Sequence, residues 1–236
     1  MAEDGAAGGS QTLARGIRLL EVLAAEGRRL SIDELAAHLG VHRSIAYRLL
    51  RTLEQHALVA RDDAGRVGLG SGLAALASGI SRDLQTAAFP ELDAVANELE
   101  MTCLLAVLLD RDEAVTLTSA APRRNMAVVS YRPGHRHPIT RGAPGKAILL
   151  GLPASAWPTD VSPELRAEIE ESRIRRYTTS HDEVVPSLRA VAVPLALPGQ
   201  PPAAIAVIHV SLPAAEADIA ARLHAAAATI ARAFGA

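Results

Sequence analysis

The hydrophobic pattern of the first quarter of the chain predicts three helices. Residues 1–11 are rich in Gly and Ala, show no hydrophobic period and are expected to be disordered. Apolar side chains then recur at helical spacing over residues 13–23. Residues 31–34, Ser-Ile-Asp-Glu, form a capping box that starts a second helix, and Gly40 ends it. A third helix is expected over residues 42–56, so two short helices joined by a tight turn predict a helix-turn-helix.

A hairpin and a connector are expected to follow this module. Residues 58–61 and 66–69 flank a polar turn and predict a hairpin where a winged helix carries its wing. A connector helix is expected over residues 70–87, and Pro90 is expected to open the next helix, because proline is favoured in a first helical turn. The connector's apolar stripe is too narrow to stabilise an isolated helix, so we expect it to pack on a second copy in a two-fold homodimer. The stripe consists of Leu73, Leu76, Ala77 and Ile80.

The second half of the chain alternates between strands and helices. Strands are expected over residues 102–109, 114–120, 126–131, 188–197 and 203–210. Helices are expected over residues 145–150 and 163–172, and residues 219–234 carry the apolar stripe of a terminal helix. Helices that flank a mainly antiparallel sheet predict an α+β fold. The expected division is a winged helix-turn-helix domain over residues 12–69, the connector over residues 70–87 and a C-terminal α+β domain over residues 88–236.

Composition and charge narrow the class of protein. The chain has 236 residues, a formal net charge of −2 and 49% apolar residues, which suits one or two globular domains and excludes a strongly basic coat-type nucleic-acid binder. Cys103 is the single cysteine and lies in an apolar run, so we expect a core residue and no disulfide or cysteine-based metal cluster. We find no signal peptide, no membrane span and no cofactor motif, and expect a cytoplasmic protein.

The third expected helix presents a basic face. At about 100° per residue, Ser44, Tyr47, Arg48 and Arg51 lie opposite the apolar stripe, on a face without carboxylates. Arginine bonds guanine edges or phosphates, although an ordinary solvated face is the alternative for the charges alone. The order of capping box, turn, basic helix and hairpin favours binding to double-stranded DNA, near-palindromic if the protein is a dimer. The expected DNA-contacting residues are Ser31, Arg43, Ser44, Tyr47, Arg48, Arg51, Arg61 and Arg66.

Two other groups of residues allow more than one interpretation. Residues 142–147 are similar to a phosphate-binding loop but lack its first glycine and its hydroxyl. The helix start after Gly145 can still bind an anion through its free amides, or it is an ordinary turn that binds no ligand. His135, His137 and His181 have no metal-ligand spacing, so we expect surface or hydrogen-bonding roles and no metal site.

Specific stretches of the chain resemble the IclR family of bacterial regulators. In the helix-turn-helix module these are residues 13–20, 31–36 and 45–53. Residues 137–140 leading into residues 145–150 resemble the central signature of the family, and Tyr177, Glu183 and residues 190–194 and 204–211 resemble its C-terminal signature. The resemblance covers the chain from about Thr12 onward. It implies a GAF-like sensor domain, a homodimer or dimer of dimers, and an effector that is usually a small organic acid or aromatic metabolite.

The resemblance also implies where the effector binds, between the central sheet and the loop that leads into the Gly-Lys-Ala helix. Pro144 has no amide to donate there, which favours a mainly apolar or aromatic acid. His209 and Ser211 share one face of the last strand, where their partner is either a ligand carboxylate or a core hydrogen bond. The expected effector-binding residues are Leu105, Val107, Met126, Val128, Ala143, Pro144, Ser180, Ala190, His209 and Ser211.

We therefore expect a ligand-responsive DNA-binding regulator, a repressor, without catalytic residues. Residues 186–187 and 211–213 depart from the glycine-containing pattern of the family beside the pocket, which leaves the ligand class open. One alternative is an enzyme, such as a hydrolase that uses Ser211 with His209, or Cys103 as nucleophile, but no catalytic motif surrounds these residues. The other is an interaction module that keeps the helix-turn-helix form without reading a DNA sequence.

Overall fold

The computed structural model describes residues 9–77, 82–124, 133–211 and 214–234. The chain forms two compact units that divide between Arg82 and Asp83, inside the expected connector. The strand expected over residues 126–131 lies outside the described residues, as does Ile80 of the connector stripe.

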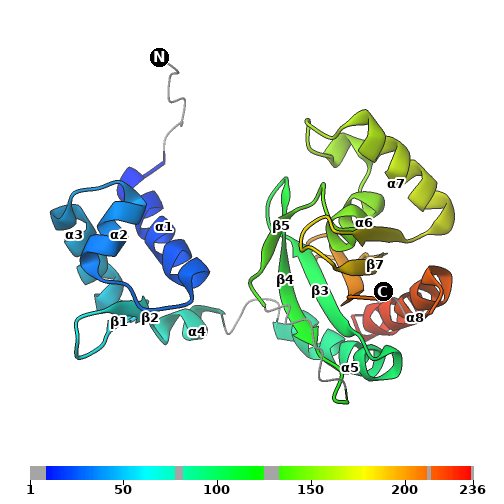
Figure 1. Ribbon diagram of the computed structural model, residues 1–236, viewed down its shortest axis with the longest axis horizontal. Helices are drawn as coiled ribbons and strands as arrows, with labels where there is room; N and C mark the ends of the chain where they lie inside the picture. The colour runs from blue at the N-terminus through cyan, green and yellow to red at the C-terminus, as the bar shows by residue number, and fades with distance from the viewer. Residues whose placement is uncertain (1–8, 78–81, 125–132, 212–213, 235–236) are drawn as a thin grey trace. The chain divides into compact units, whose positions relative to one another are not determined.

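The N-terminal unit is a helix-turn-helix followed by a two-stranded wing (Figure 1). Its elements are α1 (Gln11–Glu26), α2 (Ile32–Leu39), α3 (Arg43–Gln55), β1 (Val59–Arg61), β2 (Val67–Leu69) and α4 (Gly72–Ala77). The three helices and the wing share one core, in which Leu19, Leu35 and Leu50 are fully buried. Helix α1 begins at Gln11 with Ser10 as its N-cap, so these two residues do not belong to the expected disordered tail.

The capping box predicted at the start of α2 is confirmed. Ser31 Oγ accepts the N–H of Glu34 (3.2 Å), and Glu34 Oε2 accepts the N–H of Ser31 (2.7 Å). The bond from the Ser31 backbone, together with the Arg28 guanidinium, lowers the pKa of Glu34 to about 2. Gly40 ends the helix at φ 62°, in the left-handed region that glycine adopts without strain. The chain therefore turns sharply into α3.

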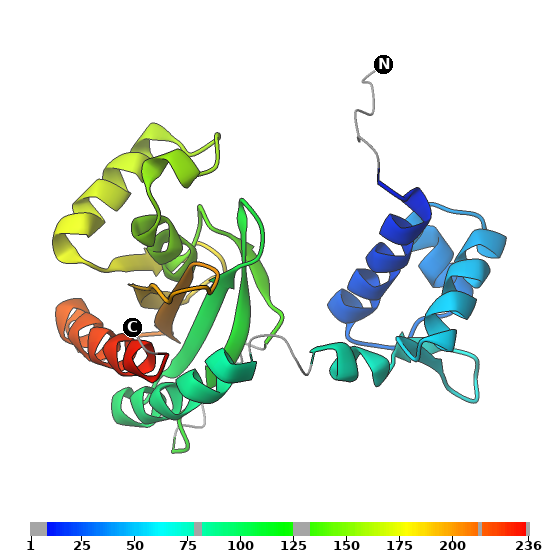
Figure 2. The ribbon, with the colours of Figure 1, turned by 180° about the vertical axis from the view of Figure 1, so that it is seen from behind.

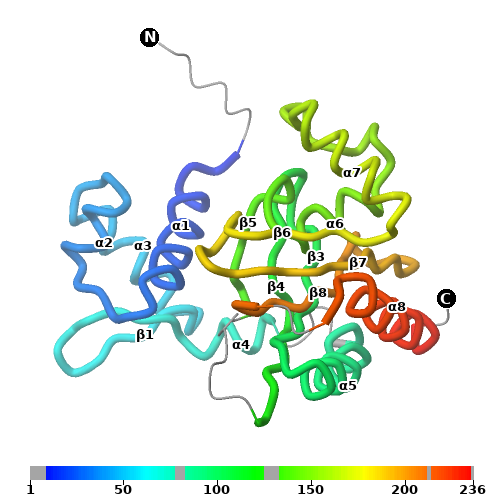
Figure 3. The backbone as a smooth tube through the Cα atoms, turned by 45° about the vertical axis from the view of Figure 1, so that its right-hand side comes forward, coloured from blue at the N-terminus to red at the C-terminus, as the bar shows by residue number. Residues whose placement is uncertain are grey.

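The C-terminal unit is built on an antiparallel sheet with the strand order β5-β4-β3-β8-β7-β6 (Figure 3). The strands are β3 (Thr102–Leu108), β4 (Glu113–Ala120), β5 (Arg136–Pro138), β6 (Thr178–His181), β7 (Arg189–Leu195) and β8 (Ala203–His209). The two edge strands, β5 and β6, were not predicted, because they are short and carry few apolar residues. The predicted α+β fold with a winged helix-turn-helix and an antiparallel sheet is confirmed.

Helices cover both faces of this sheet (Figures 1 and 2). One face packs on α5 (Arg82–Leu99) and α8 (Glu216–Ala233), and the other on α6 (Ala143–Gly151) and α7 (Pro163–Arg175). Alternate residues of β3 serve the two cores: Cys103 and Leu105 face α5 and α8, and Leu104 and Ala106 face α6. Burial raises the pKa of the Cys103 thiol, which confirms a core residue rather than a nucleophile.

Helix α6 packs unusually close to the chain that precedes it. All residues from Ala143 to Leu150 are buried. A Cβ atom on Gly145 would lie 2.7 Å from the Cα of Ile139 and 2.9 Å from the carbonyl oxygen of Pro138. Only glycine permits this approach, which sets the start of α6 directly against the end of β5.

The prediction that Pro90 opens a new helix is wrong. Helix α5 runs from Arg82 to Leu99 and contains Pro90 in its interior. Pro90 has no N–H and cannot form the intrahelical bond to residue 86, but both Phe89 and Pro90 lie on the exposed side of the helix. Tertiary packing of the opposite side therefore carries the helix through the proline. Among the described residues, no helix is both long and apolar enough to cross a membrane.

Candidate functional site

The exposed face of α3 carries side chains that the sequence assigned to DNA contact. Ser44, Tyr47, Arg48 and Arg51 are exposed, while the apolar stripe of the helix is buried in the core of the unit. The guanidinium of Arg61, from β1, lies 5.9 Å from the centroid of the Tyr47 ring. Helix and wing thus present one polar surface.

Ion pairing distinguishes the arginines of this surface. Three of them pair with carboxylates of their own unit, in the pairs Arg43–Asp33, Arg61–Glu54 and Arg66–Glu34. Arg66 also donates to the backbone carbonyl of Arg29 (3.4 Å), and the hydroxyl of Ser31 is engaged in its cap. Arg48 and Arg51 form no ion pair with any residue that the structure describes. Their guanidinium groups are therefore available for phosphates or base edges.

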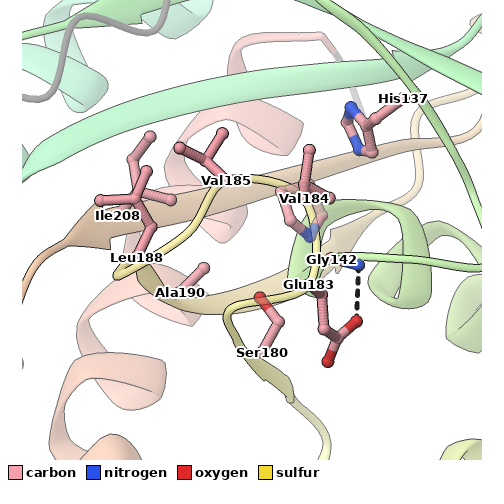
Figure 4. Close-up of a pocket in the computed structure, with 10 residues that line it drawn as sticks. His137, Gly142, Ser180, Glu183, Val184, Val185, Leu188, Ala190 and Ile208 are labelled. Carbon is pink, nitrogen blue, oxygen red and sulfur yellow. Dashed lines mark hydrogen bonds between the residues drawn. The ribbon is translucent and has the colours of Figure 1, made fainter.

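A pocket lies in the C-terminal unit at the start of α6, beside the segment of residues 183–188 that joins β6 to β7 (Figure 4). Its lining is mostly apolar, with a few polar side chains. The lining residues are His137, Gly142, Pro144, Ser180, Glu183, Val184, Val185, Leu188, Ala190 and Ile208. The free space inside holds about one or two water molecules. A larger ligand therefore requires some of the lining to move.

The start of α6 holds a carboxylate of the chain itself. Glu183 Oε2 accepts the N–H of Gly142 (2.8 Å), drawn as a dashed line in Figure 4, and Glu183 Oε1 accepts from Lys146 Nζ (2.7 Å). Ser180 Oγ accepts the N–H of Ala143 (2.9 Å). The first amides of a helix carry partial positive charge and bind anions. This corner of the pocket therefore has the chemistry of a carboxylate site, and the side chain of Glu183 fills it.

Lys146 joins α6 to two other elements. Its side chain is 2% exposed, and its Nζ lies 2.6 Å from Glu168 Oε1 of α7 as well as close to Glu183. A buried ammonium needs such partners, and removal of one partner from a buried pair costs about 3–5 kcal/mol. One ammonium and two carboxylates sum to a net charge of −1.

His137 is buried in the pocket wall without a hydrogen bond to any residue that the structure describes. Strand β5 places it opposite Ala114 of β4, and it is 2% exposed. Neither ring nitrogen has a partner within this described part of the chain, and an unsatisfied buried polar group costs about 1–3 kcal/mol. Burial lowers the pKa of His137 to about 4, with a smaller effect from His135, whose ring centroid lies 6.3 Å away. The imidazole is therefore neutral at pH 7.

Part of the expected effector set lies at this pocket. Pro144, Ser180 and Ala190 line it, and Ala143 lies beside them at the helix start. Their contact with an effector stays a prediction. Two further expected residues, Met126 and Val128, lie outside the described residues.

The other expected effector residues face away from the pocket. Leu105 and Val107 pack toward α5 and α8, because alternate residues of β3 face opposite sides of the sheet. The same alternation directs Ile208, rather than His209, into the pocket. Ser211 lies beyond the end of β8, is exposed, and donates its N–H to His209 Nδ1 (3.0 Å). The partner of His209 is thus local.

Three pocket residues were missing from the expected set: His137, Glu183 and Ile208. Ile208 lies opposite Ala190 in the pairing of β7 with β8, so the register of these strands would have indicated it. Glu183 bonds Lys146 across 37 residues, a separation that no local motif encodes. The burial of His137 depends on how β5 docks under α6. Among the described residues no three His, Cys, Asp or Glu side chains are grouped to hold a metal ion.

Comparison with known proteins decides the family. Residues 12–63 match the IclR helix-turn-helix domain, and residues 77–233 match the C-terminal domain of the bacterial transcriptional regulator IclR. The chain belongs to the IclR family. An IclR-family protein is a transcriptional regulator with a DNA-binding helix-turn-helix, and this assignment disfavours the enzyme alternative.

Individual relatives of this IclR-family chain agree with that assignment. It is 31% identical to the HTH-type transcriptional regulator Rv1719 of Mycobacterium tuberculosis over 82% of this chain and 80% of the relative. It is 28% identical to the transcriptional repressor IclR of Escherichia coli, over 79% and 75% of the two chains. The crystal structure of an IclR homologue from Microbacterium hydrocarbonoxydans, complexed with 4-hydroxybenzoate, has a TM-score of 0.81 at 22% identity, over 95% and 99% of the chains. The last likeness concerns the fold.

The buried imidazole of His137 makes stability depend on pH. Its pKa is about 4 in the folded protein and about 6.5 in the unfolded chain, so the unfolded chain binds more protons between these values. Stability is therefore complete above pH 6.5 and falls as the pH drops toward 4. When the pH falls from 7 to 5, the free energy of unfolding of the parent protein should decrease by about 2 kcal/mol more than that of the His137→Leu variant. Urea unfolding at both pH values measures this difference, and equal losses would show that His137 is solvated or paired.

Proposed function

We propose that this IclR-family regulator binds a near-palindromic operator as a homodimer, and that its pocket senses a small organic acid with an apolar or aromatic body. The observation that carries the effector proposal is the carboxylate of Glu183 at the start of α6, bonded by Gly142 and Lys146. A site that holds one carboxylate can exchange it for another. The 4-hydroxybenzoate complex of the Microbacterium homologue supports an aromatic acid as the effector class.

Effector binding is then a competition between two carboxylates. The acid replaces Glu183 at the N–H of Gly142 and beside the ammonium of Lys146, and its body packs on Val184, Val185 and neighbouring apolar side chains. Because the free space is small, this exchange displaces the segment 183–188. Release of DNA follows if that displacement changes the arrangement of the two copies in the dimer.

On the DNA side, we propose that α3 enters the major groove. Arg48 and Arg51 reach phosphates or base edges, with Ser44 and Tyr47 beside them. Arg43, Arg61 and the other expected contact residues bind DNA after they leave their present partners in the protein, or they keep these partners and orient the helix and the wing.

The connector over residues 70–87 is proposed to join the DNA-binding and effector-binding domains and to carry part of the dimer contact. Leu76 of α4 is 66% exposed, an apolar side chain left in solvent by the single chain. A second copy would bury it, and the two-fold symmetry of the pair would match a palindromic operator.

Substitution of the two unpaired arginines tests the DNA contact. Arg48→Ala should cost about 1–3 kcal/mol of operator binding if Arg48 reads a base, or lower the salt slope by about one unit if it binds a phosphate. The same holds for Arg51→Ala. Arg111→Ala, an equal change of charge in the C-terminal unit, is the control and should leave both quantities unchanged. Fluorescence anisotropy with operator DNA measures them, and full operator affinity in a folded Arg48→Ala, Arg51→Ala double variant would refute the assignment.

Substitution of Leu76 tests the dimer contact. Leu76→Asp should shift the protein toward monomers, because a charge replaces an apolar side chain at the contact. Ala74→Asp, which lies off the apolar stripe of α4, should leave the dimer intact. Light scattering at micromolar concentration measures the mass. A monomeric parent protein would contradict the proposal.

Filling the pocket tests the effector proposal. In a thermal-shift screen of aromatic and aliphatic acids, a ligand at about 100 times its Kd should stabilise the parent protein by about 2.7 kcal/mol. Ala190→Leu fills space in the pocket and should weaken binding of that acid at least about tenfold, whereas Ala196→Leu on the exposed surface should not. Equal affinity in both variants would place the effector elsewhere.

A further inference from the structure

The polar atoms that line the pocket are not equally satisfied. Ser180 accepts the N–H of Ala143, and Glu183 is bonded through both carboxylate oxygens. His137 differs, because neither of its ring nitrogens has a hydrogen-bond partner among the described residues although the side chain is 2% exposed. In Figure 4 the His137 ring lies on one side of Val184 and the Glu183 carboxylate on the other. The pocket therefore has one corner where the charged groups are hydrogen-bonded and another where the neutral imidazole of His137 lacks a partner among the described residues.

The surroundings of His137 define what can bind there. A neutral imidazole offers one N–H donor and one acceptor nitrogen, and burial disfavours its protonated form. It therefore does not neutralise a carboxylate, but it can bond a group that donates or accepts as required. A hydroxyl group does both. Thr116 Oγ1, also buried without a partner, lies on β4 next to this corner, opposite His135.

We propose that His137 is a specificity-determining residue of the effector pocket, which selects acids that carry a hydroxyl group on the end remote from the carboxylate. This inference rests on the proposed function, in which the carboxylate of the acid takes the place of Glu183. The hydroxyl of the acid then supplies the hydrogen-bond partner that His137 lacks among the described residues. An acid without the hydroxyl leaves the imidazole buried and unpaired, so it binds more weakly.

Calorimetry on the full-length protein tests this selectivity with benzoate, 3-hydroxybenzoate and 4-hydroxybenzoate. For the parent protein we expect at least one of the two hydroxybenzoates to bind about tenfold more tightly than benzoate, because only a hydroxybenzoate has the hydroxyl group that can bond the buried imidazole. In His137→Leu the preference should fall below about twofold while benzoate binding persists. His137→Gln, which keeps a donor and an acceptor, should retain part of the preference. His181→Leu, a change of an exposed histidine on β6, should retain all of it.

The outcomes separate this inference from the effector proposal. Benzoate binding without a hydroxyl preference in the parent, or a preference that survives His137→Leu, would overturn the role of His137 and leave the pocket proposal standing. A hydrogen-bonded water in place of the ligand hydroxyl would give that first result. Absence of binding by all three acids to the parent would overturn both, because it removes the aromatic acid as well as its hydroxyl.

Discussion

The structure of the pocket depends on the ion pairs of the Lys146 ammonium group. It is buried on α6 and is held by Glu168 of α7 and by Glu183 of the segment between β6 and β7. These pairs tie two other parts of the C-terminal unit to the start of α6. Gly142 completes the arrangement, since at φ 77° a Cβ atom there would lie 2.8 Å from Val184 Cγ2. The segment that closes the pocket can pack on α6 only because the helix is preceded by glycine.

In the proposed function, the side chain of Glu183 occupies the anion site, and a ligand carboxylate would exchange with it. Because the exchange would add little charge pairing, the net gain in binding would come from the apolar body of the ligand and from the imidazole of His137. Selectivity would then lie in the parts of the ligand that differ between acids, and the exchange at Glu183 would provide the movement.

Local chemistry explains what the sequence could predict. The capping box at Ser31, the turn at Gly40 and the polar face with Arg48 follow from residues within a few positions of one another. The residues of the pocket do not follow from such local patterns. Assignment of Leu105 to the pocket failed because an alternating pattern cannot say which face of a fully buried strand meets which helix. Pro90 was misplaced because packing of α5 overrides the local preference of proline.

The longer-range features needed the fold itself. Glu183 and Lys146 are far apart in the sequence, and from the sequence alone each looks like a surface charge. Only the burial of α6 in the folded unit brings the two side chains together. His137 sits in a three-residue strand whose pattern of exposed, buried and exposed residues is too short to recognise from sequence. The resemblance to the IclR family placed the expected effector site at the start of α6, and its motifs included His137 and Glu183, but it did not assign these two side chains to the pocket.

If the pocket senses an effector, binding of the acid and binding of the operator by the same protein must influence each other. Calorimetry can measure the Kd of an acid found by thermal-shift screening, first for the free full-length protein and then for the protein saturated with operator DNA. We expect two different values, separated by roughly 5- to 150-fold. Linkage requires the acid to change the Kd for the operator by the same factor. Equal Kd values for the acid with and without DNA would show that the pocket does not regulate DNA binding.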